Sequence, residues 1–120
     1  MRRAAFLCAA LASLIVTCGS QPAPTDPVAR GQQLYRTVGC VTCHDANSAG
    51  QRKGPALDHI GSVVATRRAG MRADEYIRQS ILDPGGYVVP GFEDFAARSF
   101  DRPLPPEDLD ALVAFLVSLR

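Results

Sequence analysis

The residues best suited to chemistry stand together at Cys40-Val41-Thr42-Cys43-His44. Two cysteines three positions apart, followed directly by a histidine, form a CxxCH motif, which is typical of covalent attachment of a c-type haem. The two thiols add to the two vinyl groups of one haem, and the adjacent imidazole becomes an axial ligand of the iron. The motif therefore predicts one covalent haem c held by Cys40, Cys43 and His44.

Two other kinds of site use the same residue types. A structural zinc site requires four ligands, but after Cys43 the chain contains no further cysteine and only two histidines, His44 and His59. A redox-active disulfide uses a CxxC pair, but it usually accompanies a βαβ pattern, which this sequence lacks. Haem attachment is therefore favoured over both.

The N-terminal segment indicates export. Arg2 and Arg3 precede an uncharged run of fifteen residues, from Ala4 to Cys18, which is the pattern of a secretory signal peptide. This run is shorter than the about 18 apolar residues expected of a membrane-spanning helix. We expect residues 1–17 to be a signal peptide and residues 18–26 to be a Pro-rich tether.

The end of the signal offers two routes of cleavage. Thr17-Cys18-Gly19 resembles a bacterial lipoprotein signal, in which the cysteine becomes the lipidated first residue, although Gly, Ala or Ser is usual in place of Thr17. Ordinary signal cleavage is the alternative. Either route predicts a periplasmic protein or one on the outer face of the cytoplasmic membrane. Lipidation at Cys18 would keep the domain near the membrane, because a Pro-rich tether of this length spans roughly 25 Å.

Three helices are predicted to position the motif. The first covers about 27–37, where Asp26 is a suitable N-cap and Pro27 a suitable first residue. The second covers about 73–82 and ends at a Pro-Gly-Gly turn. The third covers about 106–119, where apolar residues recur at helical spacing. The inward residues of the last two are predicted to be Tyr76, Ile77, Ser80, Ile81, Leu109, Leu112, Val113, Leu116 and Val117.

The composition is that of one small domain. The chain has 120 residues, of which 47% are hydrophobic and 21% charged, and no strand pattern or internal repeat occurs. Three helices with loops at 45–56 and 83–105 bury little apolar surface, so we expect the cofactor to complete the core. A net charge of +1 lacks the basic excess that nucleic-acid binding requires. Nucleic acid is therefore excluded as an expected partner.

The residues around the motif resemble class I c-type cytochromes, especially the small membrane-tethered cytochromes and the cytochrome domains of bacterial respiratory oxidases. Gly31 and Tyr35 resemble the family's glycine and aromatic pair at a helix crossing, and Leu112, Phe115 and Leu116 resemble the residues that meet them. The resemblance covers about residues 26–120, and the cytochrome c domain is expected at 27–120. It implies an all-α class I cytochrome c fold, with three main helices and long loops wrapped around one covalent haem.

The same resemblance extends to the residues that surround the iron ligands. Gly54-Pro55 resembles the turn in which the proline carbonyl accepts a hydrogen bond from the axial histidine, which would make Pro55 a haem-site residue that orients His44. The family's sixth ligand is a methionine in the loop before the last helix. Here residues 92–103 contain no Met, His, Cys or Lys, and Ala96 or Ala97 stands at that place.

Few residues remain as candidates for the sixth ligand. Met71 is the one internal methionine and is the candidate that the sequence offers, although its place before the second helix also suits loop or core packing. Tyr87, His59 and Lys53 fit the position less well. An iron without a protein ligand on that side is the remaining alternative.

Two functions are compatible with these features. The first is an electron carrier, not an enzyme, that exchanges single electrons with a membrane respiratory complex or another redox protein. The alternative is a haem-based gas or ligand sensor, or a weak peroxidase, with an open five-coordinate iron. Basic residues within 52–78 and acidic residues within 93–110 predict a dipolar surface that orients a partner. The candidates for pairing a haem propionate are Arg52, Arg67 and Arg68.

Overall fold

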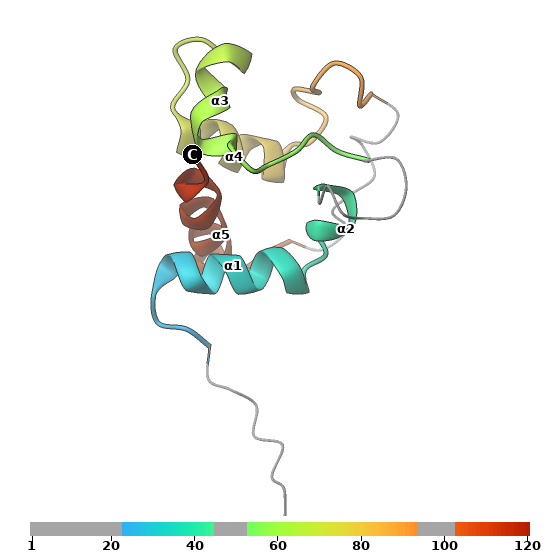
Figure 1. The fold of residues 1–120 in the computed structure, drawn as a ribbon. Coiled ribbons are helices and arrows are strands. Elements are labelled where there is room, and N and C mark those ends of the chain that lie inside the picture. Colours follow the sequence, from blue (N-terminus) through green and yellow to red (C-terminus); the bar gives the residue numbers. More distant parts are fainter. Residues whose placement is uncertain (1–22, 45–52, 94–102) are drawn as a thin grey trace, which may run out of the picture.

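The computed structural model describes residues 23–44, 53–93 and 103–120, and within these it contains helices and no strands. The order of elements is α1 (Pro27–Thr37), α2 (Val41–His44), α3 (Ile60–Arg67), α4 (Ala73–Leu82) and α5 (Pro106–Ser118). Helices α1, α4 and α5 match the three predicted helices to within one residue. The two short helices, α2 and α3, were not predicted. Figure 1 shows that α1 and α5 cross, while α3 and α4 lie near the C-terminal end of α5.

Local sequence signals explain where the main helices begin. The side chain of Asp26 accepts a hydrogen bond of 2.7 Å from the backbone N–H of Ala29, and Pro27 occupies the first turn of α1. Helix α4 carries acidic residues in its first turn, and α5 begins at Pro106, which acidic residues follow directly in the chain. These charges stabilise the positive N-terminal ends of both helices.

The crossing of α1 and α5 depends on Gly31. This residue is buried, and a Cβ atom added to it would overlap the backbone carbonyl oxygen of Ala111 and lie 2.6 Å from the Cβ of Phe115. The aromatic rings of Tyr35 and Phe115 pack beside this contact, with their centroids 5.6 Å apart. The crossing expected from the family resemblance is therefore present, and only glycine permits its close approach.

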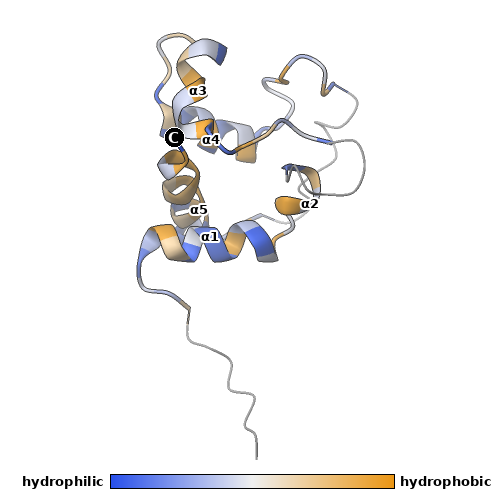
Figure 2. Cartoon of the chain, viewed as in Figure 1, coloured by the Kyte–Doolittle hydropathy of each residue, from blue (hydrophilic) through white to orange (hydrophobic). Residues whose placement is uncertain are grey.

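Helix α5 forms the centre of the core. Leu112 is the most deeply buried large side chain, at 1% exposure, and Figure 2 shows hydrophobic residues along α5, whereas α1 carries both hydrophilic and hydrophobic residues. Most of the residues predicted to point inward are buried, and Ile81 and Val117 pack against the core from partly buried positions. The core cluster consists of Ile60, Val64, Tyr76, Ile77, Leu109, Leu112, Val113, Phe115 and Leu116.

Helix α3 is held in place by tertiary contacts. Ile60 and Val64 lie one turn apart and are both buried, at 3% exposure each. The backbone N–H of Gly61 donates a hydrogen bond of 2.8 Å to the carbonyl oxygen of Leu119, beyond the end of α5. Because the helix is short and contains a glycine and several β-branched residues, its own propensity is weak, which explains why the sequence did not predict it.

None of the helices within the described residues is long and apolar enough to cross a membrane. The predicted signal peptide, residues 1–17, and the proposed lipidation site, Cys18, lie outside the described residues.

Candidate functional site

The CxxCH motif forms one short turn of helix directly after α1. Gly39 has a φ of 92°, a left-handed conformation that glycine adopts readily, and it separates α1 from α2. The backbone N–H groups of Cys43 and His44 both donate to the carbonyl oxygen of Cys40, at 3.2 and 3.1 Å. Both thiols are free and partly buried. The turn thus brings the three predicted haem-binding side chains together.

The imidazole of His44 is fixed by the Gly54-Pro55 turn. Its Nδ1 atom lies 2.8 Å from the carbonyl oxygen of Pro55, which has no proton to give, so Nδ1 is the donor. A neutral imidazole protonated at Nδ1 leaves Nε2 unprotonated and able to bind a metal. The hydrogen bond expected between Pro55 and His44 is therefore present, and it selects the tautomer that an axial iron ligand requires.

Gly54 contacts the face of the same imidazole. A Cβ atom at Gly54 would lie 2.5 Å from Cε1 of His44 and 2.7 Å from its Nδ1, closer than any side chain tolerates. The backbone N–H of Gly54 also donates a hydrogen bond of 3.0 Å to the carbonyl oxygen of Cys43. The turn is thereby attached to the motif at two points, and Gly54 is required for both to form.

These side chains line a cavity of about 530 Å³, within the range of roughly 300–1,000 Å³ that is usual for cofactor sites. One wall contains the motif and the Gly54-Pro55 turn, together with Val38, Leu57 and Ile60. The other wall comes from α4 and the segment that follows it. Its lining residues are Tyr76, Ile77, Ser80, Ile81, Pro84, Tyr87, Val88, Val89 and Phe92. The described part of the long predicted loop at 83–105 therefore has a clear role, which is to line this cavity.

The chemistry of the cavity suits a haem. Apolar side chains cover most of both walls, and the charged lining residues are the cations Lys53 and Arg67, which suit the two carboxylates of a haem. Two free thiols lie beside an imidazole whose Nε2 is available. The residues present thus fit covalent haem c, for which Cys40 and Cys43 would form the thioether bonds and His44 would bind the iron.

Burial changes the acidity of one of these thiols. Removal from water, and to a smaller extent the neighbouring Cys43, raises the pKa of Cys40 to about 11, although a backbone hydrogen bond opposes the rise. The thiol of Cys40 is therefore protonated and weakly nucleophilic in the folded polypeptide at neutral pH.

Tyr87 is held in place on the α4 side of the cavity. Its ring meets that of Tyr76 edge to face, with centroids 5.9 Å apart and an angle of 67°. The guanidinium carbon of Arg68 lies 5.2 Å from the centre of the Tyr87 ring, which is a cation–π contact. Of the arginines proposed to pair a propionate, Arg67 lines the cavity, Arg68 packs on Tyr87 instead, and Arg52 lies outside the described residues.

Met71 is not brought to the cavity. It is partly buried against the hydrophobic core and is not among the cavity-lining residues. Coordination of the iron by Met71 therefore stays a prediction that this packing does not support. His59 is exposed directly before α3, and Lys53 borders the Gly54-Pro55 turn on the His44 side. Ala96 and Ala97 lie outside the described residues.

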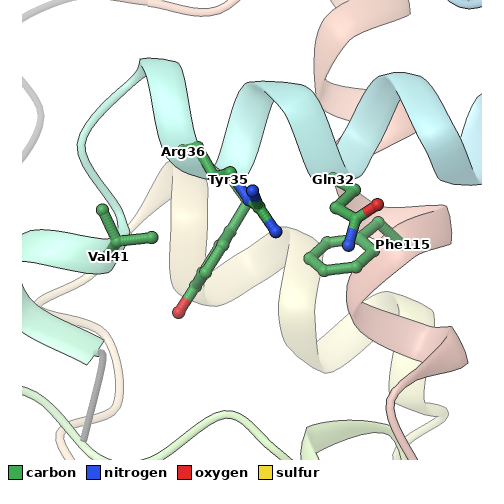
Figure 3. Close-up of a pocket in the computed structure, with 5 residues that line it drawn as sticks. All are labelled: Gln32, Tyr35, Arg36, Val41 and Phe115. Carbon is green, nitrogen blue, oxygen red and sulfur yellow. The ribbon is translucent and has the colours of Figure 1, made fainter. Parts of the chain in front are cut away.

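A second cavity, of about 450 Å³, lies where the α1–α5 crossing meets the motif. Figure 3 shows the side chain of Tyr35 projecting from α1 between Val41 and Phe115, with the polar side chains of Gln32 and Arg36 nearby. Val41 is the residue that follows Cys40. The helix crossing and the haem-attachment turn are therefore adjacent, so that the crossing supports the turn.

Ion pairs between helices modify the predicted charge distribution. Arg30 of α1 pairs with Asp108 of α5, and Nε of Arg30 lies 3.0 Å from Oδ1 of Asp108. Arg78 of α4 pairs with Asp110 of α5 at 2.6 Å. The sequence placed both aspartates in the acidic part of the predicted dipolar surface, within 93–110. Because the partners lie beside them, the dipole is smaller than the linear sequence suggests.

The described segments contain no arrangement of side chains that would support the alternative of a structural metal site. Across residues 23–44, 53–93 and 103–120, no group of three or more His, Cys, Asp or Glu side chains is placed to hold a metal ion.

Comparison with known proteins gives one match. The family model described as "Cytochrome c" matches residues 28–120, which include the CxxCH motif, the Gly54-Pro55 turn, α1 from its second residue onward and the other four helices in full. No curated protein matches the chain.

Proposed function

The chain belongs to the cytochrome c family, and on that premise we propose that it is an exported mono-haem electron carrier serving a membrane respiratory complex or another extracytoplasmic redox protein. Family membership itself establishes covalently attached haem c as the cofactor and haem-based electron transfer as the general activity. The export, the membrane partner and the absence of an enzymatic role are parts of the proposal.

The arrangement of His44 carries the proposal. Haem supplies one-electron chemistry when it is bound. Pro55 and Gly54 fix the orientation and tautomer of His44 through the 2.8 Å hydrogen bond and the contact on the ring face. A site that is held in one geometry needs little rearrangement when the charge of its cofactor changes, which suits a carrier.

Export and membrane association are supported by the N-terminal sequence. Arg2 and Arg3 followed by an uncharged run are typical of a signal peptide, and Cys18 offers a lipidation site. A short Pro-rich tether would keep the domain within about 25 Å of the membrane surface. Mass spectrometry of the mature chain distinguishes a lipidated Cys18 from an ordinary cleavage product that begins at Gly19 or later.

The cavity argues against the peroxidase alternative. Cleavage of a peroxide requires a positioned acid–base group near the iron, and the described lining residues include no carboxylate and no imidazole apart from that of His44. An electron carrier needs no such group. The described lining residues therefore favour electron transfer over peroxidase chemistry.

The proposal is tested on the full chain produced in a bacterial host that attaches haem to exported proteins. We expect haem to remain with the denatured polypeptide in the wild type and in Thr42→Ala, a matched change of an exposed residue inside the motif. The double variant Cys40→Ala and Cys43→Ala should lose it. Haem that stays with the denatured double variant would refute the attachment site.

A second experiment tests the partner. Respiratory membranes from the source organism should reduce or oxidise the purified haem protein, and a potentiometric titration should follow a single one-electron curve. The exchange rate should fall as ionic strength rises if the remaining surface charges orient the encounter. A haem protein that exchanges no electrons with these membranes would exclude a respiratory partner.

A further inference from the structure

Among the described residues, the second wall of the cavity contains no methionine, histidine, cysteine or lysine side chain. In the described residues this wall, which we call the α4 wall, is formed mainly by Tyr76, Ile77, Ser80, Ile81, Tyr87 and Val88. These side chains are aliphatic or carry a neutral hydroxyl. His44 lines the same cavity with the motif residues, so a haem held through Nε2 of His44 would have the residues of the α4 wall beside it.

The rest of the chain offers few substitutes. The only histidine besides His44 is His59, which is exposed, and the only methionine besides the initiator is Met71, which packs against the core. Residues 94–102 contain no Met, His, Cys or Lys. The usual strong protein ligands for the sixth position are therefore lacking in sequence or are placed away from the cavity.

We propose that the sixth position of the iron is a binding site for a small neutral diatomic gas, of which carbon monoxide is the probe. This inference rests on the proposed function to the extent that it requires covalent haem bound through His44. It assigns to the α4 wall a ligand-binding role that electron transfer does not need.

The polarity of the α4 wall determines which class of small molecule would bind to the iron beside it. Polarity, hydrogen-bond donors and access on the open side of a haem decide which small molecules bind. Within the residues that the structure describes, the wall carries apolar side chains and a few hydroxyl groups, with no carboxylate. The wall is also preformed, because Tyr87 is held between Tyr76 and Arg68. An apolar and preformed wall favours a neutral diatomic molecule over an anion or a peroxide.

The first measurement uses the full haem-loaded protein. A pyridine haemochrome spectrum of the denatured protein establishes that haem c is covalently bound, and its absence would overturn both the proposed function and this inference, whereas failure of the haem-loaded protein to bind carbon monoxide would overturn this inference alone. With haem present, we expect the reduced native protein to be high-spin and to bind carbon monoxide, with a shift of its main absorption band. A reduced low-spin spectrum that carbon monoxide does not change would overturn the inference.

The Met71→Leu variant tests whether Met71 itself occupies the sixth position of the iron. We expect this variant to have the same spectra and the same carbon monoxide affinity as the wild type, because Met71 packs in the core. If the wild type excludes carbon monoxide and Met71→Leu admits it, then Met71 is the sixth ligand and the inference is wrong.

A matched pair of substitutions on α4 tests the position of the site. Ser80 lines the cavity, whereas its neighbour Gln79 is exposed and does not. Ser80→Leu should fill part of the space and slow carbon monoxide association several-fold, while Gln79→Leu should leave the rate unchanged. Equal rates in both variants and the wild type would show that the gas does not bind beside the α4 wall. The wild-type measurement decides the inference even if Ser80→Leu fails to fold.

Discussion

Replacing Gly54 by alanine should displace the imidazole of His44. The added Cβ would lie 2.5 Å from Cε1 and 2.7 Å from Nδ1 of that ring. Neither the ring nor the backbone at Gly54 can move away easily. The ring is held by its hydrogen bond to the carbonyl oxygen of Pro55, and Gly54 is held by its own hydrogen bond to Cys43. We therefore expect the ring to move and its hydrogen bond to break.

The size of the effect follows from two contributions. Overpacking a tight site costs typically about 1–3 kcal/mol, and loss of one hydrogen bond costs about 0.5–1.5 kcal/mol. We expect the free energy of unfolding to fall by about 2–4 kcal/mol in total. For a domain of this size each kcal/mol lowers the Tm by roughly 4–8 °C, so the Tm should fall by about 10 °C or more.

The assay follows two properties of the haem-loaded variant. Denaturant unfolding measures the loss of stability, and the absorption spectrum during acidification measures when His44 leaves the iron. Protons compete with iron for the imidazole, so a weakened and misdirected ligand should detach at a higher pH, by about one pH unit for each 1.4 kcal/mol lost. A role in global packing alone would lower stability without moving this transition.

Gly85→Ala is the matched control. A Cβ at Gly85 would lie 4.0 Å from the nearest side-chain atom, an oxygen of Asp83, and Gly85 is exposed. This change should be neutral or slightly stabilising, because alanine restricts the unfolded chain. If Gly54→Ala unfolds and loses His44 ligation under the same conditions as Gly85→Ala, then Gly54 does not set the position of the imidazole.

Three further predictions concern residues outside the haem-attachment motif. Gly31→Ala should lower the free energy of unfolding by about 3 kcal/mol, measured by denaturant titration, because the new Cβ overlaps a backbone carbonyl of α5. A double-mutant cycle that changes Arg30 and Asp108 to alanine should give a coupling of about 1 kcal/mol, since the pair is partly exposed, at 36% and 19%. Both carboxylate oxygens of Glu93 accept the backbone N–H of Gly91, which lowers the pKa of Glu93 below its ordinary 4.5. Its stabilising contribution is thus present above pH 4.5 and lost as the pH falls through the lowered pKa. An NMR titration should place the Glu93 midpoint below 4.5, and Glu93→Gln should make stability less dependent on pH in that range.

Local signals were sufficient for the main helices. Asp26 and Pro27 predicted the start of α1, and the apolar spacing of α5 predicted most of its buried face, because capping and helical periodicity act within a few residues. Helix α3 lacks such signals. It forms because Gly61 bonds to Leu119 and because Ile60 and Val64 are buried in a core assembled from distant parts of the chain.

The residues predicted to bind haem also fall into two groups, those that local sequence predicts and those that depend on tertiary contacts. The spacing of Cys40, Cys43 and His44 predicted their chemistry, since a covalent motif is contiguous in the chain. The role of Pro55 was inferred from family resemblance, and the hydrogen bond then appeared in the structure. The clearance required at Gly54 and the position of Met71 in the core depend on contacts between segments, which no local pattern reports.

The sequence by itself determined that the chain carries a haem-attachment motif, three principal helices and no methionine in the loop before the last helix. Tertiary structure alone decided which side chains share the cavity. It placed α4 and the segment after it along the same cavity as His44, kept Met71 in the core, and paired Asp108 and Asp110 with arginines of other helices. The physical reason is that attachment chemistry and helix propensity are local, whereas the environment of an iron ligand is set by which distant surfaces pack together.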